Sequence, residues 1–151
     1  MLLKMVPEAI SAAWPQLEKH IKRAMPEAER SDSAMSTLLN MLLIDRAHCW
    51  VSYDSENNNR ANFVVVTIPT VNTMTGEKNL LLYNVTNSNS IDMKTSNRMW
   101  LEGYQAIGKF MRANGFKKLV SYFETDNKNS YDIAKKLDAN IMYYSEIPIH
   151  D

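Results

Sequence analysis

The sequence predicts a single domain of mixed α/β class over residues 1–151, in which helices flank a mixed, mostly antiparallel sheet. Three observations lead to this prediction. Two amphipathic stretches open the chain, three short strand-like segments follow with only turn residues between them, and the last third alternates helical and strand patterns. The predicted order of elements is ααβββαβαβ. With 45% hydrophobic residues, a chain of this length can bury a core.

The first two elements are predicted helices. The first has an apolar face at helical spacing, formed by Ile10, Ala13, Trp14, Leu17 and Ile21. Pro15 lacks a backbone donor, so we expect a kink or a break there, and Pro26 ends the helix. Residues 31–33 (Ser-Asp-Ser) offer an N-cap for the second helix, which stops near Asp45. Its apolar stripe consists of Met35, Leu38, Leu39 and Leu42.

Three strands are predicted next, at residues 48–54, 62–70 and 79–85. Short polar loops join them, with Gly76 in the second loop, so neighbouring strands are expected to pair antiparallel. In the first strand, Cys49 and Trp50 face opposite sides. The run Val64-Val65-Val66 in the second strand is too continuous for an edge strand and is typical of burial on both faces.

The last third of the chain changes to alternating helices and strands. A helix is expected over residues 95–114, ended by Gly115, and a strand over residues 118–124. Asp126 or Asn127 caps a short fourth helix. The last predicted strand spans residues 140–147, where apolar and aromatic residues alternate.

Composition excludes several classes of protein. Seventeen Lys and Arg residues balance seventeen Asp and Glu residues, so no overall field attracts nucleic acid or an anionic membrane. No apolar run is long enough to span a membrane, and residues 1–6 are too short for a signal peptide, so a cytoplasmic protein is expected. Cys49 is the only cysteine, which leaves no Cys-based metal site and no intrachain disulfide. A buried, inert thiol is favoured over a nucleophile there.

The predicted order of elements resembles that of GNAT-type acyltransferases. In that family two helices precede a three-stranded meander, and a helix, a strand, a helix and a strand complete the fold. The local resemblance is best over residues 127–139, where an Asn begins a short helix. Trp14-Pro15 and the strand from His48 to Tyr53 also resemble small GNAT-like proteins encoded by bacteriophages. The resemblance implies a fold built to bind acetyl-CoA.

In that family a glycine-rich turn before the third helix holds the pyrophosphate of coenzyme A with backbone amides and the positive helix end. The corresponding residues 93–98 contain no glycine, and Cβ atoms hinder so close an approach. The candidate phosphate ligands are therefore side chains. The alternative is that Thr95 or Ser96 is only an N-cap and Arg98 only a solvated residue. The candidate cofactor-binding residues are Lys94, Thr95, Ser96, Asn97, Arg98 and Asn127.

The resemblance also implies a general base near the third strand and a tyrosine in the fourth helix as general acid. Residues 80–85 carry no acid, so Glu124 is the candidate catalytic base, with Asp92 as a second choice. Either carboxylate has the alternative of being an ordinary surface residue. The position of the family's tyrosine is occupied by Ala134, and Tyr131 lies one turn earlier.

Two functions remain open at this point. The missing glycines, base and tyrosine favour a GNAT-fold protein that has lost catalysis and acts by binding, in a bacteriophage virion or against a host protein. Such a protein would have a protein partner, and it would be found in the virion or in the cytoplasm. The alternative is an acetyl-CoA-dependent N-acetyltransferase with an altered pyrophosphate loop. An open gap between the two central strands favours catalysis, and a gap plugged by Trp100, Met93 or Tyr131 favours its loss.

Overall fold

The structure of the protein is a computed structural model that describes residues 1–53, 61–87, 93–124 and 126–150, without the side chains of Met93 and Thr95. The predicted polar turn at residues 54–60 and Asp92 lie outside the described residues. The chain forms two compact units, Met1–Ser121 and Tyr122–Asp151. Because the chain divides into two units, the single domain expected over residues 1–151 stays a prediction.

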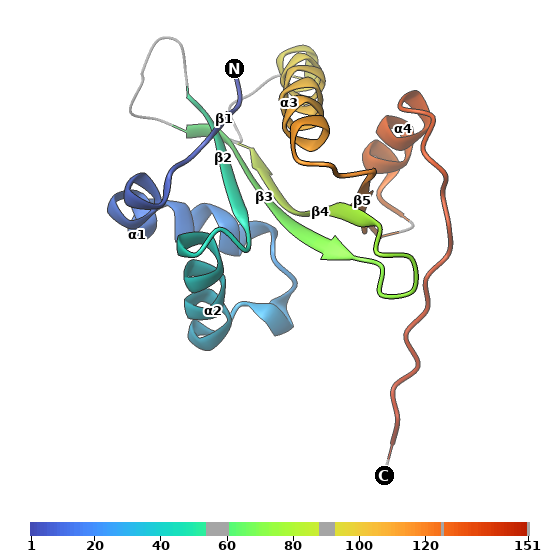
Figure 1. Cartoon of the computed structure of the whole chain (residues 1–151), viewed down its shortest axis with the longest axis horizontal. Helices are drawn as coiled ribbons and strands as arrows, with labels where there is room; N and C mark the ends of the chain where they lie inside the picture. Colours follow the sequence, from blue (N-terminus) through green and yellow to red (C-terminus); the bar gives the residue numbers. More distant parts are fainter. Residues whose placement is uncertain (54–60, 88–92, 125, 151) are drawn as a thin grey trace. The chain divides into compact units, whose positions relative to one another are not determined.

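The first unit is built on a five-stranded sheet in the order β1-β2-β3-β4-β5 (Figure 1). The strands are β1 (Leu3–Lys4), β2 (His48–Tyr53), β3 (Ala61–Val71), β4 (Lys78–Asn87) and β5 (Lys118–Ser121). Successive strands from β1 to β4 pair antiparallel, and β5 pairs parallel with β4. The predicted mixed, mostly antiparallel sheet is therefore confirmed. The sequence does not predict β1, because two residues are too few to show an alternation.

Helices cover both faces of this sheet, as Figure 1 shows. One face packs against α1 (Pro7–Ala24) and α2 (Asp32–Leu43), which the short 3₁₀ helix η1 (Glu27–Glu29) connects. The other face packs against α3 (Met93–Ala113). Val64 and Val66 of β3 belong to the α1/α2 core and Val65 to the α3 core, so the predicted burial of this strand on both faces is confirmed.

Helix α1 continues through Pro15, so the predicted break there is wrong. Pro15 cannot donate to the carbonyl of Ser11, but both residues are exposed and water can hydrate that carbonyl. The opposite face buries Ile10, Leu17 and Ile21. Burying each such side chain contributes about 1.5–3 kcal/mol, which together outweighs the roughly 3 kcal/mol cost of an internal proline.

The predicted caps of α2 and α3 are confirmed. The hydroxyl of Ser31 accepts a hydrogen bond from the backbone N–H of Ala34 at 3.1 Å and caps α2. Beyond the end of α3, Gly115 adopts a φ of 74°, and the N–H of Phe116 donates to the carbonyl of Met111 at 3.0 Å. The chain can therefore turn sharply from α3 into β5.

Strand β4 contains a β-bulge at Tyr83. Val66 of β3 faces Asn84, whereas the next residue, Thr67, faces Leu82, so Tyr83 is an extra residue in β4. Without it, the side chains of Tyr83 and Asn84 would point to opposite faces of the sheet. With it, both lie on the α1/α2 side.

The polar residues after the bulge bind the C-terminal end of α1. The side-chain amide of Asn84 donates to the carbonyl of Ile21 at 3.1 Å, and the hydroxyl of Thr86 lies 2.9 Å from the carbonyl of His20. Ile21 is among the last four residues of α1, whose carbonyls lack partners within the helix. Asn84 therefore satisfies a buried acceptor and fixes α1 against β4.

Strand β5 ends earlier than the sequence predicts. Its pairing with β4 begins with Asn79 opposite Lys118 and ends with Leu82 opposite Ser121. The predicted extension of β5 to Glu124 is therefore wrong. The bulge at Tyr83 follows directly on β4. Since a bulge bends its strand and increases the local twist, the two strands stop pairing at this point.

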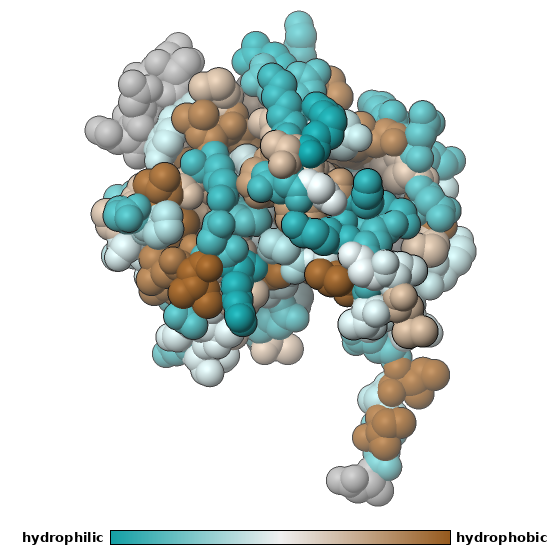
Figure 2. Space-filling view, in the orientation of Figure 1, coloured by the Kyte–Doolittle hydropathy of each residue, from teal (hydrophilic) through white to brown (hydrophobic). Residues whose placement is uncertain are grey.

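In the second unit, helix α4 (Lys128–Lys136) forms as predicted, and the side chain of Asn127 caps it by accepting from the N–H of Ser130 at 3.1 Å. The predicted strand over residues 140–147 is wrong, because the described residues 140–150 form no strand. An alternating pattern describes side chains only, whereas a strand also needs a neighbour for its backbone groups. Several apolar and aromatic side chains of this segment are exposed: Ile141, Met142, Tyr143, Ile147 and Ile149. Figure 2 shows brown, hydrophobic atoms along the extended C-terminal tail.

The described residues also bear on the single cysteine and on membrane insertion. Cys49 is fully buried in β2, and this burial raises the pKa of its thiol to about 12, as expected for an inert side chain. Within the described part of the chain, no helix has both the length and the apolar character needed to cross a membrane.

Replacing Asn84 by Leu should destabilise the protein by about 1–3 kcal/mol, because the buried carbonyl of Ile21 loses its donor. Chemical unfolding in urea measures this change. The matched control is Asn40→Leu on the exposed face of α2, which should change the free energy of unfolding by less than about 0.5 kcal/mol. Equal effects of the two substitutions would contradict a stabilising contact between Asn84 and α1.

Candidate functional site

The candidate site lies where β4 and β5 stop pairing. Beyond Leu82, β4 continues to Asn87, and no described strand pairs with residues 83–87 on the β5 side. Backbone N–H and C=O groups of a strand alternate between its two neighbours, so this stretch presents groups that still need partners. We use the term β4 edge for residues 83–87 on the side of β4 where β5 pairs with residues 79–82.

Of the three residues that could fill the gap between β4 and β5, Trp100 has a defined place within the first unit. The ring of Trp100 packs edge-on against Phe63 of β3, with 5.7 Å between ring centroids, in the core beneath α3. Trp100 is thus held against β3. The side chain of Met93 lies outside the described residues, and Tyr131 belongs to the second unit, where Lys135 lies over its ring at 4.9 Å.

The predicted phosphate ligands lie at the start of α3. Lys94, Asn97 and Arg98 are exposed and Ser96 is half-buried, whereas nothing is described of the side chain of Thr95. Because α3 begins at Met93, Thr95 and Ser96 occupy its first turn and not the cap position.

The charges at this end of α3 suit an anion. Arg98 makes only a loose ion pair with Glu102, at 3.9 Å between Nε and Oε1, and Lys94 has no ion-pair partner among the described residues. Two exposed cations at the positive end of a helix favour negatively charged ligands.

The other predicted site residues belong to the second unit. Glu124 is exposed, and its backbone carbonyl accepts from the N–H of Asn127 at 2.9 Å. The side-chain oxygen of Asn127 is engaged in capping α4. Ala134, at the position of the family's tyrosine, is half-buried in α4. The roles of Glu124 as a base and of Asn127 as a cofactor ligand stay predictions.

The structure reveals a carboxylate beside the bulge that the sequence analysis missed. The hydroxyl of Tyr83 donates to Oε2 of Glu29, at 2.7 Å. Burial and this hydrogen bond raise the pKa of Tyr83 to about 12, so the phenol stays protonated. The two residues are 54 positions apart in the sequence, and no spacing pattern connects them.

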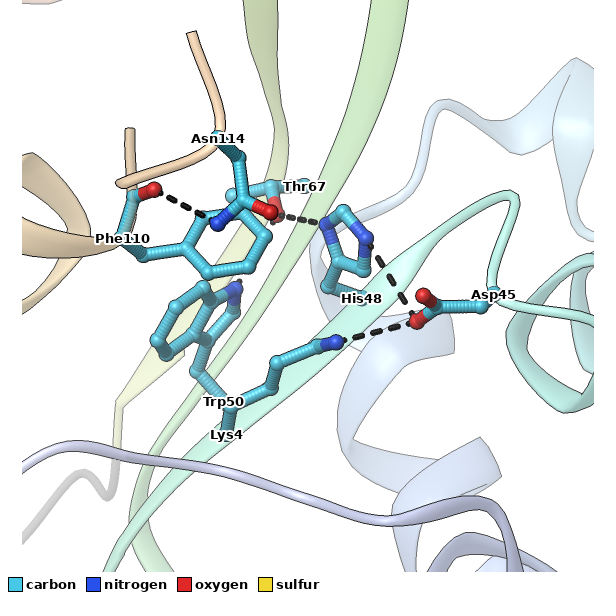
Figure 3. A network of polar contacts seen from close by, with 7 residues as sticks. All are labelled: Lys4, Asp45, His48, Trp50, Thr67, Phe110 and Asn114. Atoms are coloured by element: carbon cyan, nitrogen blue, oxygen red, sulfur yellow. Dashed lines mark hydrogen bonds and ion pairs between the residues drawn. The ribbon is translucent and has the colours of Figure 1, made fainter. Parts of the chain in front are cut away.

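A polar cluster around His48 has the residue types of a catalytic triad (Figure 3). Oδ1 of Asp45 lies 3.6 Å from Nε2 of His48, and Nδ1 of His48 lies 3.4 Å from the hydroxyl of Thr67. The indole N–H of Trp50 donates to the same hydroxyl at 3.0 Å, and Lys4 binds Asp45 at 2.9 Å. Strands β1, β2 and β3 and the turn after α2 thus meet at one cluster.

Burial makes this cluster structural and not catalytic. Thr67 is fully buried, so no substrate reaches its hydroxyl. The hydroxyl of Thr67 accepts from Trp50, so the hydroxyl proton of Thr67 can point to Nδ1 of His48. In this arrangement the neutral imidazole carries its proton on Nε2, which faces Asp45. Burial and, to a smaller extent, the charge of Lys4 lower the pKa of His48, and Asp45 opposes this shift. The edge of Phe110 closes the cluster, 4.9 Å away between ring centroids.

A second surface feature lies toward the C-terminal end of α3. A groove of about 380 Å³ runs between α3 and the start of β5, and Lys109, Arg112 and Lys117 line it. These cations have no ion-pair partner within the described residues. A Cβ at Gly108 would lie 3.6 Å from the guanidinium of Arg112, an ordinary van der Waals contact. Lys94 lies at the opposite end of the helix.

Comparison with known proteins identifies the fold. No protein-family model and no curated protein sequence matches the chain. Among solved structures, a probable acetyltransferase superposes with a TM-score of 0.71 at 11% identity, covering 100% of this chain and 99% of that one. An aminoglycoside acetyltransferase from an uncultured soil metagenomic sample, in complex with sisomicin, gives 0.70 at 10% identity, with 100% and 96% covered.

A third structure is AAC(6')-Iy in complex with the bisubstrate analog CoA-S-monomethyl-acetylneamine. It gives a TM-score of 0.67 at 13% identity, with 98% of each chain covered. At these identities the likeness shows the fold alone. The chain has the GNAT acetyltransferase fold, which confirms the fold that the sequence predicted. The resemblance to phage-encoded proteins stays a prediction.

The His48 cluster predicts how stability depends on pH. Because the pKa of His48 is lower in the folded protein than in the unfolded chain, protons bind the unfolded chain more readily. The stability due to neutral His48 is complete above the unfolded pKa of about 6.5 and is lost as pH falls toward the folded pKa. Urea midpoints measured from about pH 8 to about pH 5 should fall more steeply for the wild type than for His48→Asn. Parallel profiles would contradict a buried neutral imidazole.

Proposed function

We propose that this protein is an N-acetyltransferase that uses acetyl-CoA and holds its pyrophosphate with side chains in place of a glycine-rich turn. The observation that carries the proposal is the separation of β4 from β5 at the Tyr83 bulge. A sheet in which a strand pair opens beside a bulge has an internal edge, and such an edge can pair with an extended ligand.

The chemistry of coenzyme A suits the β4 edge. Its pantetheine arm is an extended chain with two amide groups, which can pair with free backbone groups as an added strand would. The β4 edge offers such groups over residues 83–87. When bound, acetyl-CoA supplies an acetyl thioester whose carbonyl carbon accepts an amine nitrogen, with release of the free thiol.

The start of α3 is the proposed place for the phosphates. β4 leads into α3, so the N-terminal end of this helix follows the β4 edge along the chain. Lys94 and Arg98 lie one turn apart there and supply the charge. Arg98 can bind a phosphate with two parallel N–H groups and Lys94 as a point charge, so neither needs the close main-chain approach that glycine permits.

The comparisons favour acetyl transfer over the interpretation that catalysis has been lost. The similar structures include a probable acetyltransferase and an aminoglycoside acetyltransferase, and a third was determined with a coenzyme A bisubstrate analog. Another, at 10% identity and a TM-score of 0.64, is a ribosomal-protein-alanine N-acetyltransferase from Brucella melitensis biovar Abortus 2308. Nothing in the structure or in these comparisons supports a place in a virion or a host-protein partner.

Acetyl-CoA should stabilise the protein against thermal unfolding. At a concentration of about 100 times its Kd, binding adds about 2.7 kcal/mol. For a chain of this length that is a rise of about 5–10 °C in Tm, measurable by differential scanning fluorimetry. The double variant Lys94→Ala/Arg98→Ala should bind acetyl-CoA about tenfold or more weakly in calorimetric titration, because two charge-assisted contacts are lost.

Helix α1 offers a matched control for this variant. Lys19 and Arg23 are likewise exposed and one turn apart, so Lys19→Ala/Arg23→Ala removes the same charge from another helix. This control should leave the affinity for acetyl-CoA within about twofold. Absence of any acetyl-CoA binding by the wild type would refute the proposed function, and equal losses in the two double variants would refute the proposed phosphate site.

A further inference from the structure

We infer that the groove between α3 and the start of β5 binds a small aromatic acid in its anionic form. The ring of this ligand lies against the apolar wall of the groove, and its acidic group binds Lys109, Arg112 and Lys117. The site is separate from the proposed acetyl transfer. Lys94 and Arg112 lie near opposite ends of α3, about 27 Å apart along its axis at about 1.5 Å per residue. All residues that line the groove belong to the first unit.

Positive charge is concentrated beside this groove. Acids and bases balance over the whole chain, but residues 103–121 contain four cations and no acid: Lys109, Arg112, Lys117 and Lys118. The carboxylate of Glu77, which lies next to this stretch, is bound to Lys118 at 3.0 Å. The hydrogen bond with Lys118 is the main cause of the lowered pKa of Glu77, and the charge of Lys117 contributes least to it. The cations that line the groove can therefore compensate the charge of a ligand.

The apolar wall of the groove is fixed in place without a ligand. Met111, Phe116 and Leu119 line the groove and also pack against the core beneath α3. The ring of Phe116 stacks on that of Phe110 with 5.9 Å between the centroids, and Nζ of Lys78 lies 4.7 Å from the centroid of Phe116. Because the wall is already ordered, a ligand that binds it loses little free energy to ordering of the protein.

Gly108 lies in the middle of the helical wall, and packing within the protein does not require a glycine there. A Cβ at this position would make only an ordinary contact with Arg112. Gly103, in contrast, is buried, and a Cβ there would already lie 3.4 Å from Cδ2 of Leu2. Apart from proline, glycine is the least favourable residue in a helix interior. A groove that has to stay free of side chains explains its presence at position 108.

The size and the lining of the groove specify the class of ligand. A volume of about 380 Å³ falls within the usual range for sites of small molecules. Arg112 can bind a carboxylate, sulfonate or phosphate with two parallel N–H groups, and the lysines bind it as point charges. Guanidinium and ammonium groups also interact favourably with the face of an aromatic ring, which favours an aromatic over an aliphatic acid.

Two probes with the same ring separate charge recognition from apolar contact. Naphthalene-2-sulfonate is negatively charged at neutral pH, whereas naphthalene-2-methanol is neutral. Two-dimensional NMR titrations of the full chain measure both Kd values, and the amide shifts of residues 104–119 report the place of binding. The sulfonate should bind about tenfold more tightly than the alcohol. Lys109→Gln/Arg112→Gln should weaken the sulfonate about tenfold and leave the alcohol within about twofold.

Two further variants control for net charge and for the place of binding. Lys19→Gln/Arg23→Gln removes the same charge from exposed positions of α1 and should change neither Kd by more than about twofold. Gly108→Leu places a side chain in the groove, so both probes should bind about tenfold more weakly. Its urea midpoint should equal or exceed that of the wild type, because leucine is the better helix former, and this measurement excludes misfolding as the cause.

Several results would overturn the inference. They are an absence of saturable shifts at residues 104–119 with the sulfonate, equal affinities for the two probes, equal losses in the two double variants, and wild-type binding of both probes by a folded Gly108→Leu variant. Coenzyme A should leave the Kd of the sulfonate within about twofold. Displacement of the sulfonate by coenzyme A would assign the groove to the coenzyme and would also overturn the inference. Failure of the wild type to bind acetyl-CoA, in contrast, overturns only the proposed function.

Discussion

The bulge at Tyr83 is the constraint on which most of this structure depends. One extra residue in β4 turns Tyr83 and Asn84 to the same side of the sheet and ends the ladder with β5. The change in side-chain direction lets Asn84 bind the last turn of α1, and the interrupted ladder leaves the β4 edge without a strand partner among the described residues. A stabilising contact and an opening in the sheet thus have a common origin.

Polar contacts fix the positions of the helices and strands of the first unit relative to one another, which apolar packing alone specifies less strictly. Asn84 joins β4 to α1, and the cluster around His48 joins β1, β2, β3 and the turn after α2. Asn84, His48 and Thr67 are buried, so each needs a specific partner, and this requirement favours one arrangement of the elements. The same burial prevents the side chains of His48 and Thr67 from acting on a substrate.

In the proposed function, a sheet edge and a helix end replace the glycine-rich turn that the sequence lacks. The fold is that of acetyltransferases, but a fold does not fix an activity. What bears on activity is local: an edge of β4 that no described strand pairs with, two cations at the start of α3, and a carboxylate held beside the bulge. Glycine would let the main chain approach a diphosphate closely, whereas we propose that Lys94 and Arg98 reach it with their long side chains.

The sequence by itself determined the order of elements from α1 to α4, the helix caps at Ser31, Gly115 and Asn127, and the burial of the Val64-Val65-Val66 strand. It could do so because periodicity and capping act between near neighbours in the chain. It failed for β1, for the end of β5 and for residues 140–147, where the presence of a strand depends on a partner that no local pattern specifies. It also identified Lys94 and Arg98 as candidates but missed Glu29. Only the tertiary structure brings Glu29 to Tyr83, since a bulge and the path of a connection decide which distant side chains meet.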